Sequence, residues 1–180
     1  MRIIFMGTPT FALPSLEKIY KEHEIISVFT KVDKPNARGK KINYSPIKEF
    51  ALANDLKIYQ PENFKDSALI EEIRNMQADL IVVVAYGKIL PKEIIDMPKY
   101  GIINLHSSLL PRFRGAAPIN AAIINGDRKS GVSIMYVEEE LDAGDVILQE
   151  ETEITDEDTF LSLHDRLKDM GADLLLKAIE

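Results

Sequence analysis

The most constraining feature of the sequence is a run of five consecutive aliphatic residues, Leu80 to Val84, within the stretch ADLIVVVAYG at 78–87. A strand with one face in water alternates apolar and polar residues, whereas a strand covered on both faces is apolar throughout. The run therefore predicts a central strand in a sheet that carries helices on both sides. Strands of this kind are typical of parallel sheets in α/β proteins.

The rest of the chain alternates predicted strands with predicted helices. Further strands are predicted at residues 2–6, 25–30, 57–61, 101–106, 131–137 and 145–151. Helices are predicted in the residues after Pro14 and at 44–55, 66–76, 116–125 and 157–178. This order predicts one α/β domain with a doubly wound, mostly parallel, Rossmann-like sheet of about six to seven strands.

Composition excludes several classes of protein. The sequence has no cysteine, so it can form no disulfide framework and no thiolate zinc site, and we expect no metal. No apolar run approaches the ~20 residues of a membrane helix, and the N-terminal MRIIFMG is too short for a signal peptide. We therefore expect a soluble cytoplasmic protein that has no membrane partner and is a monomer.

Charge is unevenly distributed along the chain. The formal net charge is −7, which by itself argues against a nucleic-acid partner. Residues 31–48, however, hold six positive residues and one negative residue, a local charge of +5 that leaves −12 on the remainder. The stretch 31–44 is also longer than most connections in α/β domains. Two interpretations stay open here, a solvated connection and a segment that binds an anionic partner.

Phosphate-binding glycine motifs are absent. A dinucleotide fingerprint needs three glycines in a G-x-G-x-x-G pattern, and the turn after the first strand contains only Gly7. The stretch ARGKK lacks the upstream glycine of a P-loop. The sequence thus gives no support for a standard nucleotide site.

Polar residues gather where the predicted strand 101–106 ends. Asn104 and His106 are two apart, so in a strand their side chains point to the same side, at the end where parallel sheets bind ligands. An amide donor beside an imidazole suits acyl transfer, because one can stabilise an oxyanion and the other can handle a proton. A third polar group could be Asp142 or Asp145, although either could instead be a turn residue. For His164, on the last predicted helix, a structural role is favoured.

The loop after His106 contains two pairs of residues whose roles stay open. Leu109 and Leu110 would be exposed unless they line a pocket or pack beneath the loop. Arg112 and Arg114 could hold an anionic ligand or be ordinary surface cations.

Two longer stretches resemble the folate-dependent formyltransferase family. NLHSSLLPRFRGAAPI, followed by GVSIMYVEEELDAGDVI, contains the family pattern Asn-x-His, Leu-Pro-x-x-Arg-Gly and Leu-Asp-x-Gly. RIIFMGTPTFALPSL, PNARGKKINYSPIKEFA and VVVAYGKILP resemble, in order, the branch of the family that acts on an aminoacylated tRNA. The basic segment distinguishes this branch, and the resemblance covers essentially the whole chain.

The resemblance implies a formyltransferase fold and a set of functional residues. The donor would be 10-formyltetrahydrofolate, the acceptor the α-amine of initiator methionyl-tRNA, and no metal or covalent intermediate would be needed. The implied catalytic residues are Asn104, His106 and Asp142. The implied folate contacts are Ser108, Leu109, Leu110, Pro111, Ala85, Tyr86, Gly87, Ile89 and Leu90. The implied tRNA contacts are Arg38, Lys40 and Lys41.

The resemblance also implies a longer parent protein. Residues 1–180 would be the catalytic domain, and a C-terminal barrel domain would be missing from this chain. Three other functions stay possible: a formyltransferase acting on a sugar-nucleotide or ribonucleotide amine, a non-catalytic fragment that binds folate or tRNA, and hydrolysis of the formyl group to formate.

Overall fold

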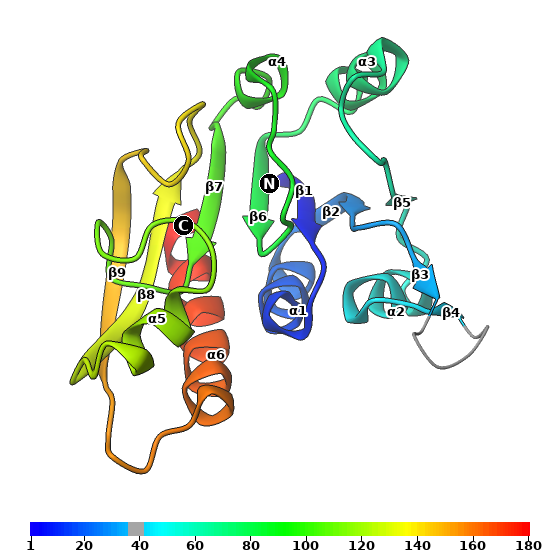
Figure 1. Ribbon diagram of the computed structural model, residues 1–180. Coiled ribbons are helices and arrows are strands. Elements are labelled where there is room, and N and C mark those ends of the chain that lie inside the picture. Colours follow the sequence, from blue (N-terminus) through cyan, green and yellow to red (C-terminus); the bar gives the residue numbers. More distant parts are fainter. Residues whose placement is uncertain (36–41) are drawn as a thin grey trace.

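The computed structural model describes residues 1–35 and 42–180 (Figure 1). Within these residues the main sheet has seven strands in the order β5–β2–β1–β6–β7–β8–β9. Their bounds are β1 Arg2–Gly7, β2 Glu24–Phe29, β5 Ile58–Tyr59, β6 Leu80–Val84, β7 Ile102–His106, β8 Lys129–Tyr136 and β9 Val146–Glu153. The strands from β5 to β7 pair in parallel, and β8 runs antiparallel to both β7 and β9. The predicted, mostly parallel α/β sheet is confirmed.

Helices cover both faces of the sheet, as the apolar run at β6 predicts (Figure 1). One face packs against α1 (Leu13–Glu22), α2 (Pro46–Ala53), α5 (Pro118–Ile124) and α6 (Phe160–Ile179). The other face packs against α3 (Ser67–Asn75) and α4 (Lys92–Ile95). Within β6, Val82 faces the first helical layer and Ile81 the second, and both are fully buried or nearly so. The sheet is therefore doubly wound.

Several short elements differ from the sequence-based expectation. The 3-10 helix η1 (Thr10–Ala12) and the single turn α4 were not predicted, and the expected strand at 57–61 is reduced to two residues. Within the long segment, β3 (Lys34–Pro35) pairs with β4 (Ile42–Asn43) as a small antiparallel hairpin. Elements of two to four residues are too short to show a hydrophobic period, so the sequence pattern could not reveal them. None of the helices in the described part of the chain is long and apolar enough to cross a membrane.

The start of α6 is held by a hydrogen-bonded carboxylate. Asp158 precedes the capping residue Thr159 and accepts hydrogen bonds from Thr155 N at 2.9 Å, from Ser162 Oγ at 2.7 Å and from the Arg166 guanidinium. The backbone hydrogen bond from Thr155, followed by those from Ser162 and Arg166, lowers the pKa of Asp158 to about 2. The ionised carboxylate therefore stabilises the folded chain.

We expect Asp158→Ala to lower the free energy of unfolding by about 2 kcal/mol at pH 7, since hydrogen bonds to a charged group are lost. Because the folded-state pKa lies below the ordinary value, the contribution is complete above that value and is lost as the pH falls towards 2. Urea unfolding of both proteins should therefore show a difference that narrows below about pH 4. Asp169→Ala, at an exposed position of the same helix, is the control. A difference that does not change with pH would contradict this assignment.

Candidate active site

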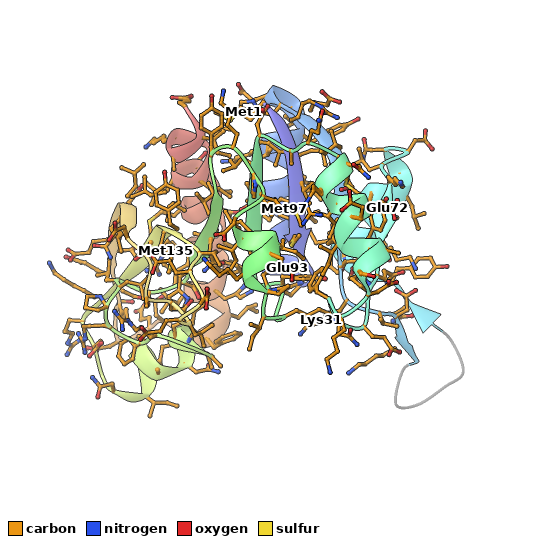
Figure 2. All side chains as sticks on the ribbon, turned by 90° about the horizontal axis from the view of Figure 1, so that it is seen from above. Met1, Lys31, Glu72, Glu93, Met97 and Met135 are labelled. Carbon is orange, nitrogen blue, oxygen red and sulfur yellow. The ribbon has the colours of Figure 1, made fainter. Side chains whose placement is uncertain are left out.

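The cavity at the carboxyl ends of β6 and β7 has a volume of about 670 Å³. Part of its wall is a row of residues in register across three strands, Val83 on β6, Asn104 on β7 and Met135 on β8. Figure 2 labels Met135 within this part of the sheet. The rest of the wall comes from loops, from the end of β7, and from η1, α5 and α6. Parallel sheets bind their ligands at this edge, where the strands end and loops diverge.

Asn104, His106 and Asp142 all line this cavity. The first two come from β7 with the two-residue spacing that places side chains on one side, and His106 is only 7% exposed. Asp142 comes from the turn between β8 and β9, and its Oδ2 lies 3.8 Å from His106 Nδ1 and 2.7 Å from the Gly115 nitrogen that donates to it. Asp145 is exposed and does not line the cavity. Of the two aspartates left open by the sequence, the structure places Asp142 beside the imidazole.

A backbone carbonyl orients the imidazole of His106. Its Nε2 lies 2.9 Å from the carbonyl oxygen of Phe113. A carbonyl oxygen can only accept, so Nε2 carries the hydrogen and Nδ1 is the nitrogen that faces Asp142. The 3.8 Å separation between Nδ1 and the Asp142 carboxylate is longer than a hydrogen bond. The hydrogen bond that holds the imidazole is therefore the one to the Phe113 carbonyl, which no sequence pattern indicated, and not one to Asp142.

Left-handed backbone conformations concentrate around the cavity. Ala85, Ala117 and Asp142 line it with φ of 47°, 57° and 51°, and Phe113, which binds His106, has a φ of 55°. Each costs roughly 1–2 kcal/mol in a residue with a side chain. Such strain persists where surrounding structure imposes it, commonly at functional sites.

One group of predicted folate contacts lines the cavity. Ala85, Tyr86, Gly87, Ile89 and Leu90 follow β6 and form one side of it. Ile89 is 82% exposed and Tyr86 is almost fully buried, so the segment offers both an apolar surface at the mouth and a packed base. Burial raises the pKa of the Tyr86 hydroxyl, which is therefore neutral near pH 7.

The other predicted folate contacts do not line the cavity. Ser108, Leu109, Leu110 and Pro111 belong to the loop that packs across β8. Ser133 Oγ accepts from Leu110 N at 3.1 Å and donates to the Ser108 carbonyl at 2.6 Å. Leu109 lies against the backbone of β8, and Leu110 is buried. The two leucines were expected either to line a pocket or to pack beneath their loop, and in the structure they pack beneath it. A direct contact of these leucines with folate therefore loses its support.

The arginines of this loop differ from one another. Arg112 Nη2 donates to Asp127 Oδ1 at 3.1 Å, and its guanidinium lies 5.0 Å from the Phe113 ring centroid. Because Arg112 already pairs with Asp127, its proposed role in binding an anionic ligand loses support. Arg114 is exposed. The predicted tRNA contacts Arg38, Lys40 and Lys41 lie outside the described residues.

An aromatic part of the cavity wall was missed by the sequence analysis. Phe11 from η1 and Phe160 and His164 from α6 line the cavity, with ring centroids 5.3 Å apart for Phe11 and His164 and 5.5 Å for Phe160 and His164. His164, for which a structural role was favoured, packs on both phenylalanine rings and also lines the cavity. The i, i+4 spacing of Phe160 and His164 could have suggested one helix face, but only the tertiary fold brings Phe11 to it.

The arrangement suits chemistry at a carbonyl carbon. An amide donor, an imidazole and a carboxylate converge in a cavity whose lining is mostly apolar, where electrostatic interactions are stronger than in water. Within residues 1–35 and 42–180, no three histidine, aspartate or glutamate side chains converge in a group that could hold a metal ion. Asn104 can donate a hydrogen bond into the cavity, and the imidazole of His106 and the carboxylate of Asp142 are groups that can accept a proton.

Comparisons with known proteins agree with this chemistry. Residues 1–179 match the pattern that defines the formyl transferase family. The methionyl-tRNA formyltransferase of Fusobacterium nucleatum subsp. nucleatum is 94% identical over 180 residues, which are 100% of this chain and 58% of that protein. The methionyl-tRNA formyltransferase of Alkaliphilus oremlandii is 54% identical over 99% of this chain and 58% of its own length. The chain thus spans about 58% of the length of these curated relatives.

A solved structure shares the fold. Phosphoribosylglycinamide formyltransferase from Streptococcus pneumoniae TIGR4 is 23% identical and superposes with a TM-score of 0.80 over 99% of this chain and 96% of that one. At this identity the likeness supports the architecture, while the match over nearly all 180 residues supports the family. The chain belongs to the formyl transferase family.

Proposed function

We propose that the protein transfers the formyl group of 10-formyltetrahydrofolate to the α-amine of initiator methionyl-tRNA, as a step of translation initiation. The observation that carries this proposal is the convergence of Asn104, His106 and Asp142 on one cavity. The 94% identity to a methionyl-tRNA formyltransferase supports the choice of acceptor.

The reaction is a direct acyl transfer. The lone pair of the neutral amine forms the new C–N bond at the formyl carbon, and the carbonyl π electrons move to the formyl oxygen. When the carbonyl reforms, the bond to N10 of the folate breaks, and N10 receives a proton in exchange for the one that the amine loses. Asn104 can donate an amide hydrogen to the developing oxyanion, an interaction that is stronger in the transition state than in the ground state.

His106 and Asp142 handle the proton. Because Nε2 donates to the Phe113 carbonyl, Nδ1 is the nitrogen available to the reacting groups, and it lies beside the Asp142 carboxylate. The negative carboxylate of Asp142 stabilises a positive imidazole. The same carboxylate can accept the amine proton directly or through a water. The backbone amide of Gly115 holds the carboxylate in place at 2.7 Å.

The segment after β6 is the proposed folate-binding side. Ala85, Tyr86, Gly87, Ile89 and Leu90 present a backbone turn and apolar side chains along the cavity. A flat heterocycle suits such a site, since backbone groups can pair with its polar edge while side chains cover its faces.

The acceptor is proposed to approach from the basic segment. Arg38, Lys40 and Lys41 would contact phosphates of the acceptor stem, and each contact would release counterions. We also propose that the natural protein is a cytoplasmic monomer with a further C-terminal barrel domain. Size-exclusion chromatography and cell fractionation of the natural protein would test this proposal.

The experiment compares formyl acceptors in the full-length protein with 10-formyltetrahydrofolate as the donor. Methionyl initiator tRNA should be formylated, whereas glycinamide ribonucleotide, an amino-sugar nucleotide and water should give little product. Replacing Arg38, Lys40 and Lys41 by alanine should flatten the slope of log affinity for tRNA against log salt by about two to three units. Binding of a folate analogue should not change.

Other outcomes would redirect the proposal. Faster transfer to a ribonucleotide or sugar-nucleotide amine would identify a different acceptor, and release of formate without an amine would identify a hydrolase. Tight binding of folate or tRNA without any turnover would identify a binding protein. An unchanged salt slope in the triple variant would leave the segment as a solvated connection.

A further inference from the structure

Outside the cavity, Asp33, Lys48 and Gln60 form a closed hydrogen-bonded cluster. Lys48 Nζ pairs with Asp33 Oδ2 and donates to Gln60 Oε1 at 2.8 Å. Gln60 Nε2 donates to Asp33 Oδ1 at 2.9 Å, so each of the three side chains contacts the other two. The same Gln60 nitrogen also lies 2.7 Å from the carbonyl of Lys31.

The cluster is shielded from water. The side chains of Lys48 and Asp33 are only 14% and 20% exposed, and the ring of Tyr44 covers the ammonium at 4.1 Å from its centroid. Burial raises the pKa of Asp33, but the hydrogen bonds from Lys48 and Gln60 and the charge of Lys48 outweigh it, so the pKa lies below its ordinary value. The positive charge of Lys48 is therefore balanced by the negative charge of Asp33 inside the protein. Lys48 adds to the positive count of residues 31–48 without offering a free cation.

The cluster joins three parts of the chain. Lys31 and Asp33 come just before β3, Tyr44 and Lys48 come just after β4, and Gln60 directly follows β5. A hydrogen bond between the hydroxyl groups of Thr30 and Ser45, with the oxygens 2.9 Å apart, is a second link between the residues before β3 and those after β4. Residues 30–33 and 44–48 are therefore hydrogen-bonded to each other, and Gln60 joins both to the end of β5.

Lys31, which precedes β3, also contacts residues at the rim of the cavity. Lys31 N donates to Thr8 Oγ1 at 3.3 Å, next to the cavity-lining Pro9. A Cβ added to Gly87 would lie 2.9 Å from Cε of Lys31, so the stem of that lysine lies on the backbone of a residue that lines the cavity. Figure 2 labels Lys31 on the side of the molecule where the hairpin projects.

We propose that Asp33, Lys48 and Gln60 are positioning residues for the nucleic-acid acceptor. They hold the exposed cation Lys31 at the cavity rim, where a polyanionic strand entering the site must pass. This inference rests on the function proposed above. Its physical basis is preorganisation: a surface that is ordered before binding loses less conformational entropy when the partner arrives. Buried ion pairs contribute little net stability because of their desolvation cost, but they impose a specific geometry.

The test measures steady-state formylation by the full-length protein and its variants Gln60→Leu, Lys48→Met and Asp33→Asn. KM for methionyl-tRNA should rise about tenfold, which corresponds to the entropy of re-ordering one or two long side chains at each turnover. The value of kcat at saturating tRNA and KM for the formyl donor should stay within about twofold, because the cluster lies outside the cavity. Lys57→Met is the matched control, since Lys57 is an exposed cation near the same edge strand and pairs with Glu72.

Two variants separate the effect of the cluster on tRNA binding from a failure of the protein to fold. Gln60→Leu leaves the ion pair of Asp33 and Lys48 in place, so it should fold even if Lys48→Met, which removes the positive partner of the largely buried Asp33, does not. The double variant Asp33→Asn, Lys48→Met should raise KM little beyond the worse single variant, because both act through one cluster.

Results of three kinds would overturn the inference. One is an unchanged KM for tRNA in Gln60→Leu. Another is a rise in the KM for the donor equal to that for tRNA together with a lower melting temperature, which would indicate a purely structural role. A third is a matching loss in Lys57→Met. The proposed function is judged separately, from the wild-type rates with different acceptors, whereas the cluster is judged from the ratio of variant to wild type.

Discussion

Alanine at His106 or at Asp142 should lower the rate of formyl transfer by about 10²–10⁴, the range for groups that handle a proton in the transition state. His106 Nδ1 and Asp142 Oδ2 lie 3.8 Å apart, and both side chains are largely buried, so we expect each to lose most of its effect when the other is absent. The double variant should therefore be little slower than the slower single variant. Single-turnover assays with methionyl-tRNA under saturating donor would measure this.

Asp145→Ala provides the matched control for the carboxylate. Asp145 belongs to the same turn as Asp142 but is exposed and outside the cavity, so its replacement should change the rate less than about twofold. Losses that multiply in the double variant would show that His106 and Asp142 act independently. Equal losses at Asp145 and Asp142 would show that the turn, and not the carboxylate, matters.

Asn104→Ala should lower turnover by about 10²–10³, the scale for losing one oxyanion donor. Asn104→Asp should lose at least as much, because it keeps the shape of the side chain and replaces the donating amide by a negative charge. Both variants should bind a folate analogue almost as wild type does, since the proposed folate contacts follow β6. Isothermal titration with the analogue, run beside the turnover assay, separates the two effects.

A small effect of Asn104→Ala, within a few-fold of wild type, would remove the oxyanion role. Equal losses in turnover and in affinity for the analogue would instead place Asn104 among the donor contacts.

Local sequence pattern was sufficient for the longer elements and for part of the site. The apolar run of β6 predicts burial on both faces because a strand alternates its side chains, and Val82 and Ile81 do face different helical layers. The two-residue spacing of Asn104 and His106 places them on one side of β7 for the same reason. The fold and these placements depend on periods of two and 3.6 residues, which are visible in any stretch of sufficient length.

Pattern failed where a contact joins residues far apart in the chain. Residue type alone did not separate Asp142 from Asp145, although the family resemblance implied Asp142, and the turn between β8 and β9 brings Asp142 to His106. From the sequence, Leu109 and Leu110 could have lined a pocket. In the structure Ser133 of β8 forms hydrogen bonds with the backbone of Ser108 and Leu110, and these hold the loop against the sheet.

Two further features depended entirely on the tertiary structure. His164 reaches the cavity because α6 packs beside η1, and the Phe113 carbonyl meets His106 because its residue adopts a left-handed backbone conformation.

The basic segment shows both sides of this division. Its charge and length were visible in the sequence, because charge is a property of composition, but they left a solvated connection and an anionic partner equally open. Only the tertiary structure revealed that Lys48 is buried against Asp33 and Gln60 instead of facing a ligand. The sequence by itself thus determined which of the longer elements form and which side of a strand each residue takes, since these depend on near neighbours. The tertiary structure alone decided which side chains meet, because those contacts are set by how distant elements pack.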